Sequence, residues 1–255
     1  TWHHADNLTS NAYTDHTVNV PSQTGMHSTL WAGKLYYQFP LLTGQVNIGT
    51  EDSYTFNHQQ YTILNSDISS YVPSTMNESK QYAYAAFATF TRDFGKLTLN
   101  LGLRWESIKF DYYQNKVKDH DVSRNQSSLS PDFSLSWQFN QETSMALDYK
   151  QYIVRPAYQQ LRSSLLYVSP YEVEGGNPTL DDCYNYEASY MFGWKGLIFE
   201  AGYTYKKDAF VYTKEHYSID SPQLIFSPHN EDYSLLTAYI SYSRTVGIWK
   251  PTLTV

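Results

Sequence analysis

The stretch YNYEASYMFGWKGLIFEAGYTYK, residues 184–206, decides the fold class of this chain. On both sides of the central GWKG, aromatic and small apolar residues occupy every second position, and polar residues such as Glu187 and Glu200 lie between them. A period of two is that of a β-strand, whose side chains alternate between two faces. The stretch therefore predicts an antiparallel hairpin whose strands share one apolar face.

A four-residue turn at 193–196 is expected in this hairpin. Folded there, Phe192 would face Leu197, and Tyr190 would face Phe199. Large residues lie by the turn, alanines in the middle and tyrosines at the far end, an order that resembles two aromatic girdles around an apolar waist. Eight residues of a tilted strand rise about 20 Å, close to the apolar band of an outer-membrane barrel.

Similar short turns recur along the chain at nearly constant spacing. They are centred on Leu42, Phe94, Gln141, Trp194 and Val246. Longer polar stretches separate them, at 57–80, 112–128, 157–182 and 213–231. Tight turns that alternate with long connections predict an all-β, antiparallel up-and-down transmembrane barrel, here with about ten strands. The long connections are expected to be extracellular, with Ser164 accessible, and the short turns, with Lys195, periplasmic.

Alternation also predicts which side chains face lipid. Leu101 and Phe199 are expected to point outward, and Asn100, Glu200 and Thr204 inward, because a slip of one residue would place charges in hydrocarbon. A soluble β-sandwich has alternating strands too and remains an alternative. The length of the runs and the 25 Tyr residues favour the membrane barrel.

Composition excludes several other classes. The chain has 17% charged and 17% aromatic residues, a mean hydropathy of -0.53 and no apolar run long enough for a transmembrane helix. A formal net charge of -7 without a Lys/Arg cluster argues against nucleic acid as a partner. The single cysteine, Cys183, excludes an intrachain disulfide and fits no cysteine-based metal motif.

The two ends of the sequence bear on domain organisation. The chain opens in a polar stretch, its apolar alternation starts near Trp31, and it stops a few residues after the last turn. Ten strands ending in mid-hairpin would leave two open edges, which lipid does not tolerate because each backbone polar group must be paired there. Residues 1–255 are therefore expected to be part of a single barrel domain that lacks its first and terminal strands.

Two short motifs carry a family resemblance. RPAYQQL at 155–161 and GNPTL at 176–180 resemble the RPxYxxL and GNPxL pattern of TonB-dependent outer-membrane receptors, most closely those of the Bacteroidetes-type outer-membrane β-barrel family. GLRWE at 102–106 is similar to the GLRxE strand of that family. The matching residues are Arg155, Pro156, Tyr158, Leu161, Gly176, Asn177, Pro178, Leu180, Gly102, Arg104 and Glu106.

The resemblance implies a fold, a location and an activity. It implies a larger, 22-stranded barrel in the cell outer membrane of a Gram-negative bacterium, lying in outer-membrane lipid. It further implies a receptor that imports a scarce or bulky solute with TonB-coupled energy. The TonB complex would act through a plug that these residues do not contain, and a surface lipoprotein is a further possible partner. No cofactor is implied.

Two other functions stay open. One is an outer-membrane barrel without transport, such as an adhesin or structural receptor. The other is a soluble β-rich carbohydrate-binding module whose exposed aromatic rings stack on sugars. A plug sequence in the full gene would separate transport from adhesion, and dependence on detergent would separate both from the soluble module.

The motif residues also have a physical interpretation without any family. Proline cannot donate to a β-ladder, so Arg155-Pro156 ends a strand, and the glycines, Asn177 and Pro178 of 175–178 predict a turn. A structural role in an extracellular loop is favoured over ligand contact. Arg104 and Glu106 lie at inward positions, where they would contact a plug, line the lumen or pair with charges on neighbouring strands.

No residues indicate an enzyme. His3-His4 are adjacent and would point to opposite sides of an extended chain, without a carboxylate or cysteine at ligand spacing. The acidic pairs Asp181-Asp182 and Glu231-Asp232 fall in polar stretches, where such pairs are common, and they are weak support for glycosidase chemistry.

Overall fold

The computed structural model describes residues 2–12, 17–64, 72–216, 223–245 and 247–254, and side chains from residue 20 onward. The described chain forms one sheet of 13 strands. The strands are β1 (Trp2–Ala12), β2 (Thr17–Leu41), β3 (Gly44–Ile63), β4 (Thr75–Asp93), β5 (Leu97–Gln114), β6 (Val117–Asn140), β7 (Thr143–Val154), β8 (Leu165–Ser169), β9 (Glu172–Gly175), β10 (Cys183–Trp194), β11 (Leu197–His216), β12 (Leu224–Ser243) and β13 (Thr252–Thr254). None of the described residues belongs to a helix that is long and apolar enough to cross a membrane.

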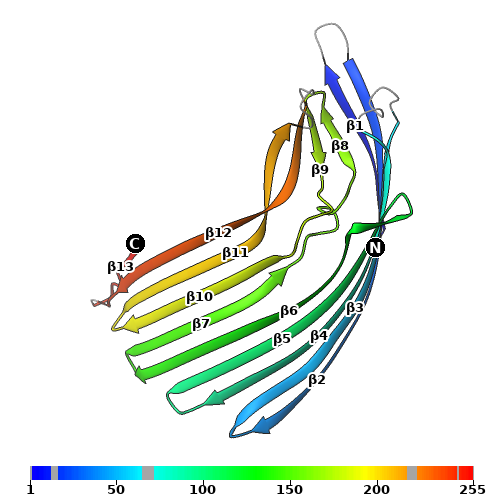
Figure 1. Cartoon of the computed structure of the whole chain (residues 1–255). Helices are drawn as coiled ribbons and strands as arrows, with labels where there is room; N and C mark the ends of the chain where they lie inside the picture. Colours follow the sequence, from blue (N-terminus) through cyan, green and yellow to red (C-terminus); the bar gives the residue numbers. More distant parts are fainter. Residues whose placement is uncertain (1, 13–16, 65–71, 217–222, 246, 255) are drawn as a thin grey trace.

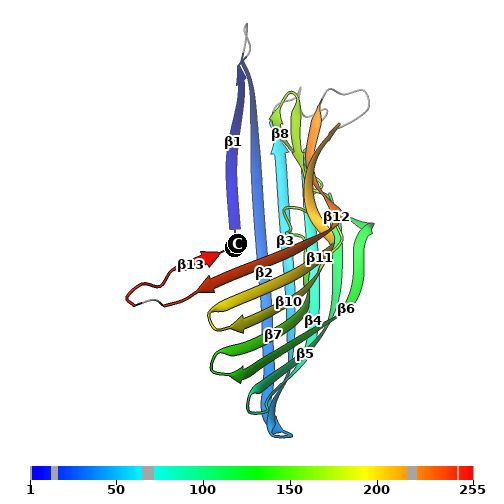
Figure 2. The same cartoon turned by 90° about the vertical axis from the view of Figure 1, so that its left-hand side faces the viewer.

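Sequence neighbours are sheet neighbours along most of the chain. The strand order is β1-β2-β3-β4-β5-β6-β7-β10-β11-β12-β9-β8, and β13 pairs with β12. All pairings are antiparallel except that of β12 with β9. The sheet is strongly curved, and the short β2–β3, β4–β5, β6–β7 and β10–β11 turns lie together at one end of the strands (Figures 1 and 2). The turn expected at Val246 is centred outside the described residues. These features confirm the predicted all-β up-and-down fold; over the described residues the sheet remains open.

The two faces of the sheet differ in chemistry. One row of paired residues crosses the sheet from β2 to β12 and is apolar or aromatic throughout. It consists of Phe39, Val46, Phe90, Leu101, Phe133, Tyr149, Ala188, Tyr203 and Leu236. The adjacent row, on the opposite face, is Gln38, Asn47, Thr89, Gly102, Asp132, Lys150, Glu187, Thr204 and Leu235.

We call the face of the first row the apolar face and that of the second the polar face. Leu101 lies on the apolar face and Thr204 on the polar face, so the predicted alternation between them is confirmed. Many side chains of the apolar face are exposed, including Leu101, Leu103 and Trp105 on β5. A continuous exposed apolar surface of this extent is what a sheet in contact with lipid presents.

The turns are tighter than the sequence indicates. Phe192 pairs with Phe199, and Trp194 pairs with Leu197, so the predicted register of this hairpin was wrong by two residues. The reason is a two-residue turn in which Lys195 and Gly196 both have positive φ, of 49° and 86°, as in the turns that match strand twist. Since side chains alternate with period two, a shift of two residues leaves the face assignment unchanged.

The strands extend well into the polar stretches expected to be loops. Between β5 and β6 only Asn115 and Lys116 form the connection, so the loop predicted at 112–128 is mostly strand. The strands β1, β8 and β9 account for the difference between 13 strands and the expected ten. Of these, β1 lies in the polar stretch with which the sequence begins. In these polar stretches the strands are stabilised by backbone hydrogen bonds to the adjacent strand, which an alternation of apolar residues in the sequence does not reveal.

Candidate functional site

The segment between β7 and β10, residues 155–182, folds back over the polar face of the sheet. Leu161 and Leu180 are buried against Phe110, Tyr112 and Val122. Phe110 and Tyr112 occupy the same face of β5 as Gly102, so the covered face is the polar one. We call residues 155–182 the motif segment, since it contains both family motifs.

The hairpin β8–β9 within the motif segment joins distant parts of the sheet. Figure 1 shows it between β12 and the β1 end of the sheet, and β9 pairs with β12. Tyr167 and Val173 of this hairpin are buried with Val20, Tyr61 and Ile63 of β2 and β3. The backbone N–H of Tyr167 donates to the hydroxyl of Tyr61 at 3.3 Å. The motif segment therefore contacts β2 and β3 near one edge of the curved sheet and β12 near the other, at the end of the strands away from the short turns.

Ser164 illustrates the difference from the sequence-based expectation. It was expected to be an accessible loop position, but it is only 5% exposed. The hydroxyl of the neighbouring Ser163 donates to Asn77 at 2.7 Å on β4. The prediction that Ser164 is accessible was wrong because the motif segment packs against the sheet.

Charged side chains connect the motif segment to the strands. Glu106 accepts hydrogen bonds from Arg155, at the start of the motif segment, and from Arg104 Nε at 2.6 Å. Arg104 Nη1 lies 2.7 Å from Glu51 on β3, and Lys34 Nζ of β2 lies 2.6 Å from the same carboxylate. Positively and negatively charged side chains thus alternate from β2 to the motif segment. Ion pairs with neighbouring strands were one of the predicted roles of Arg104 and Glu106.

The other end of the motif segment joins this network through Asp182. Its carboxylate lies 3.6 Å from Arg124 Nη2 and 3.8 Å from Arg155 Nε. Arg124 Nη1 also donates to the carbonyl oxygen of Leu180 at 2.5 Å. Burial raises the pKa of the Asp182 carboxyl, while the two guanidinium groups act in the opposite direction. Arg155 contacts both Glu106 and Asp182, so one side chain links the start and the end of the motif segment.

The GNPxL residues form a compact turn within the segment. The Asn177 backbone N–H donates to the carbonyl oxygen of Gln160 at 2.6 Å, and its side-chain amide donates to Pro228 at 3.1 Å. Its side-chain oxygen accepts from Thr179 N–H at 3.0 Å, which is an Asx turn leading through Pro178. At Gly176 a Cβ atom would lie too close to the carbonyl oxygen of Gln160. These contacts require glycine and asparagine at their positions.

The remaining motif residues lie close to the same network. Pro156 is buried directly after the end of β7, as expected of a strand-ending proline. Tyr158 packs beside Leu161, and burial raises the pKa of its hydroxyl. Gly102 faces Asp132 so closely that a Cβ atom would collide with the carboxylate. The residues recognised in the sequence therefore come together around Arg155 and Leu161.

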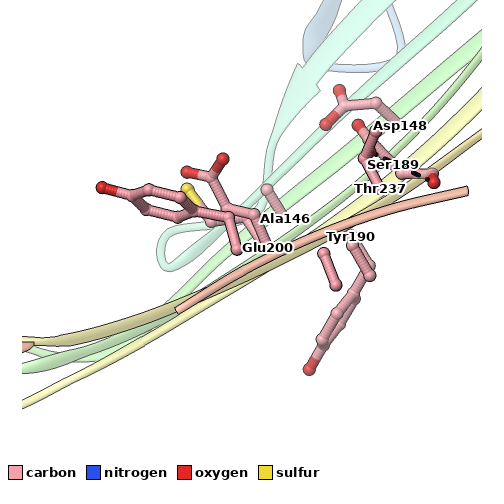
Figure 3. A pocket seen from close by; sticks show the side chains of 11 residues that line it. Ala146, Asp148, Ser189, Tyr190, Glu200 and Thr237 are labelled. Carbon is pink, nitrogen blue, oxygen red and sulfur yellow. Dashed lines mark hydrogen bonds between the residues drawn. The ribbon is translucent and has the colours of Figure 1, made fainter. Parts of the chain in front are cut away.

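Two hollows are open on the polar face. The first, of about 370 Å³, is lined by the charged network, including Lys34, Arg104 and Arg155. The second, of about 360 Å³, spans β7 to β12; Figure 3 shows Asp148 and Glu200 on one side of the sheet and Tyr190 on the other. Within the described part of the chain, these two carboxylates form no ion pair, and no cluster of three or more His, Cys, Asp or Glu side chains is placed to hold a metal.

Sequence reasoning missed Arg124 and Asp182 as partners of the motif residues. Asp182 lies two residues after Leu180, but its adjacency to Asp181 suggested an ordinary acidic loop. Arg124 carries no local signal, because its contact with Leu180 depends on how β6 passes the motif segment.

We expect Glu106→Gln to loosen the motif segment. The substitution removes the charge shared by Arg104 and Arg155, and a hydrogen bond to a charged group contributes about 1.5–3 kcal/mol. Because Arg155 is partly exposed, we expect a loss of about 1.5 kcal/mol in the free energy of unfolding, together with faster proteolysis within 155–182. Glu142→Gln in the exposed β6–β7 turn is the control. Equal protease resistance of both variants would contradict the anchoring role.

Comparison with known proteins supports the fold. The model of the outer membrane protein beta-barrel family matches residues 3–249. A solved structure of the copper transporter OprC has a TM-score of 0.65 at 12% identity, over 99% of this chain and 41% of that chain. The hemophore receptor HasR of Serratia marcescens has a TM-score of 0.56 at 11% identity, over 92% and 42% of the respective chains.

The ferric enterobactin receptor PfeA of Pseudomonas aeruginosa has a TM-score of 0.50 at 14% identity, over 94% of this chain and 36% of that chain. The chain thus spans less than half the length of each of these solved proteins. No match was found among curated protein sequences. At these identities the structural likeness establishes the fold, and the family match covers nearly the whole chain. The chain belongs to the outer membrane protein beta-barrel family, located in the outer membrane of a Gram-negative bacterium.

Proposed function

We propose that residues 1–255 form part of the wall of a single barrel domain in an active transport receptor, which imports a scarce or bulky solute with TonB-coupled energy. The observation that supports this most is the motif segment, which is packed on the polar face rather than extended into solvent. A segment held inside a barrel narrows the route through it. The proposal places the plug and the remaining strands outside these residues, and assigns no catalytic role.

The polar face offers a surface for such a plug. Asp148 and Glu200 stand among small residues such as Ser189 and Gly202 in the second hollow, so a basic segment has room to approach both carboxylates. The likenesses to a copper transporter and a hemophore receptor support transport as the general activity. In this proposal the TonB complex contacts the plug and not the wall.

Orientation follows from the asymmetry of turns and connections. We expect the β5–β6 turn at Lys116 to be extracellular and the β10–β11 turn at Lys195 to be periplasmic. Both residues are exposed, in two-residue turns, with positive φ, so Lys116→Cys and Lys195→Cys are matched variants in a Cys183→Ser background. A membrane-impermeant maleimide should label only position 116 on intact cells. Labelling of position 195 before the outer membrane is permeabilised would reverse the orientation.

Transport is tested by comparing solute depletion from the medium. Cells with and without the whole protein are grown with and without a protonophore, which removes the inner-membrane energy used by TonB. A solute whose uptake requires both the protein and that energy supports the proposal. Unchanged uptake of all solutes, combined with reduced cell attachment on deletion, would reject transport in favour of an adhesin.

A further inference from the structure

The apolar face carries an aromatic hollow near the middle of β2 and β3, about ten residues along the strands from the short turns. It has a volume of about 280 Å³ and is lined by Trp31, Tyr54, Tyr82 and Tyr84. Trp31, Tyr54 and Tyr82 form one row across β2, β3 and β4, and the rings of Tyr54 and Tyr82 lie 4.8 Å apart. Tryptophan and tyrosine gather where a membrane meets water. This row therefore marks the level of the lipid headgroups.

Lysine side chains border the hollow on the same face. Lys109 of β5 pairs with Tyr82 and continues the aromatic row. Lys80 lies two residues before Tyr82 on β4, one row further from the short turns, and pairs with Asp111. Lys118 Nζ lies 2.6 Å from Asp111, and Lys109 Nζ lies 3.8 Å from it. Three lysines thus surround one carboxylate.

Part of this positive charge remains available to a ligand. Lys109 has 56% of its side chain exposed, and its distance to Asp111 is long for an ion pair. Lys80 Nζ lies 5.3 Å from the centre of the Tyr113 ring and has no ion pair with a described residue. Two other carboxylates lie on this face: Glu78 contacts His58 at 3.1 Å, and Asp52 lines the hollow.

The height of the lysines fits that of lipid phosphates. Exposed apolar residues of β5 end at Trp105, and Lys109 lies about 13 Å further along the strand, or about 10 Å in height if the strand is tilted as in other barrels. Basic side chains level with the aromatic row, such as Lys109, or one row beyond it, such as Lys80, attract anionic headgroups, and each lysine adds to the affinity. The aromatic hollow below them is continuous with the apolar face.

We propose that Lys80, Lys109, Lys118 and the aromatic hollow form a binding site for one phosphorylated lipid of the outer leaflet. The phosphate contacts Lys80 and Lys109, Lys118 adds to the positive potential, and the apolar body of the lipid covers Tyr54 and Tyr82. A free phosphate ion would use the lysines alone. The hollow and its continuity with the apolar face therefore favour a lipid as the occupant.

The test measures lipid binding to the whole protein folded in detergent micelles. Dioleoyl phosphatidic acid is the probe, dioleoyl phosphatidylcholine the reference, and bound lipids are counted by native mass spectrometry. We expect tighter binding of the phosphatidic acid, and a loss of at least about tenfold in its affinity in the triple variant K80Q/K109Q/K118Q. An excess of inorganic phosphate should not displace the lipid.

Two further variants separate charge from folding. K80R/K109R/K118R retains the charges and should bind as the unaltered chain does. K195Q/K207Q/K250Q removes the same number of exposed lysines elsewhere and should leave affinity within about twofold. Equal losses in both glutamine variants, no preference for phosphatidic acid, or displacement by inorganic phosphate at millimolar concentration would each overturn the proposal.

Discussion

Leu180→Ala is expected to lower the free energy of unfolding by about 2–5 kcal/mol, the range for truncating a buried leucine. Leu180 has no exposed surface and packs with Leu161, Phe110 and Tyr112. The carbonyl oxygen of Leu180 also accepts a hydrogen bond from Arg124, which holds the backbone in place. The cavity that the substitution creates therefore cannot easily close. Denaturant unfolding of the lipid-reconstituted chain gives the change in stability.

The control for this prediction is Leu64→Ala, the same truncation at a leucine that is 58% exposed. It should change stability by less than about 0.5 kcal/mol, as surface substitutions do. Similar losses at positions 64 and 180 would show that the motif segment is not packed on the polar face. Limited proteolysis adds a local measurement, because only Leu180→Ala should increase cleavage within 155–182.

Leu101→Arg is expected to destabilise the membrane-inserted sheet by about 2–4 kcal/mol, the cost of arginine near the bilayer midplane on a lipid-facing strand. Leu101 lies in the middle of the apolar row and pairs with Phe90 and Phe133. The matched variant is Thr204→Arg, on the polar face between Glu187 and Leu235. It should cost far less, because an arginine there lies beside the Glu187 carboxylate on the face that does not contact lipid.

Unfolding of both variants from lipid bilayers decides the assignment of the faces. If Thr204→Arg were as destabilising as Leu101→Arg, neither face could be assigned to lipid. If Thr204→Arg were more destabilising than Leu101→Arg, the polar face and not the apolar face would be the one in contact with lipid. Measurement in detergent is a useful companion, since micelles tolerate charge at the apolar surface better than a bilayer does.

The fold could be predicted because its signal is local. Alternation around 184–206 gave the hairpin and its apolar face, and both appear in β10 and β11. The register was wrong by two residues because the left-handed conformation of Lys195 cannot be seen in a sequence where Gly193 also permits a turn. Strand ends were placed too early, since Asn115 and Lys116 close a tight turn among polar neighbours.

The candidate site was only partly predictable, because its contacts join residues far apart in sequence. Arg155 and Leu161 were recognised from their motif, but the expected extracellular loop is a segment packed on the sheet. Its pairing with β12 through β9, and the approach of Arg124 to Asp182, depend on the curvature of the sheet. Alternation along a strand determines which face a residue occupies, but not what covers that face.

The central claim is that the apolar face contacts lipid while the polar face does not, and an accessibility scan of β5 tests it most directly. Each residue from 97 to 106 except Gly102, which has no room for a side chain, is replaced in turn by a spin-labelled cysteine, in a Cys183→Ser background, and the whole protein is reconstituted in bilayers. Collision with oxygen reports lipid and collision with a water-soluble nickel complex reports water. We predict high oxygen access at the odd positions, including Leu101 and Leu103, and low oxygen access at the even positions. Equal access at odd and even positions, or nickel access highest at Leu101, would contradict the account.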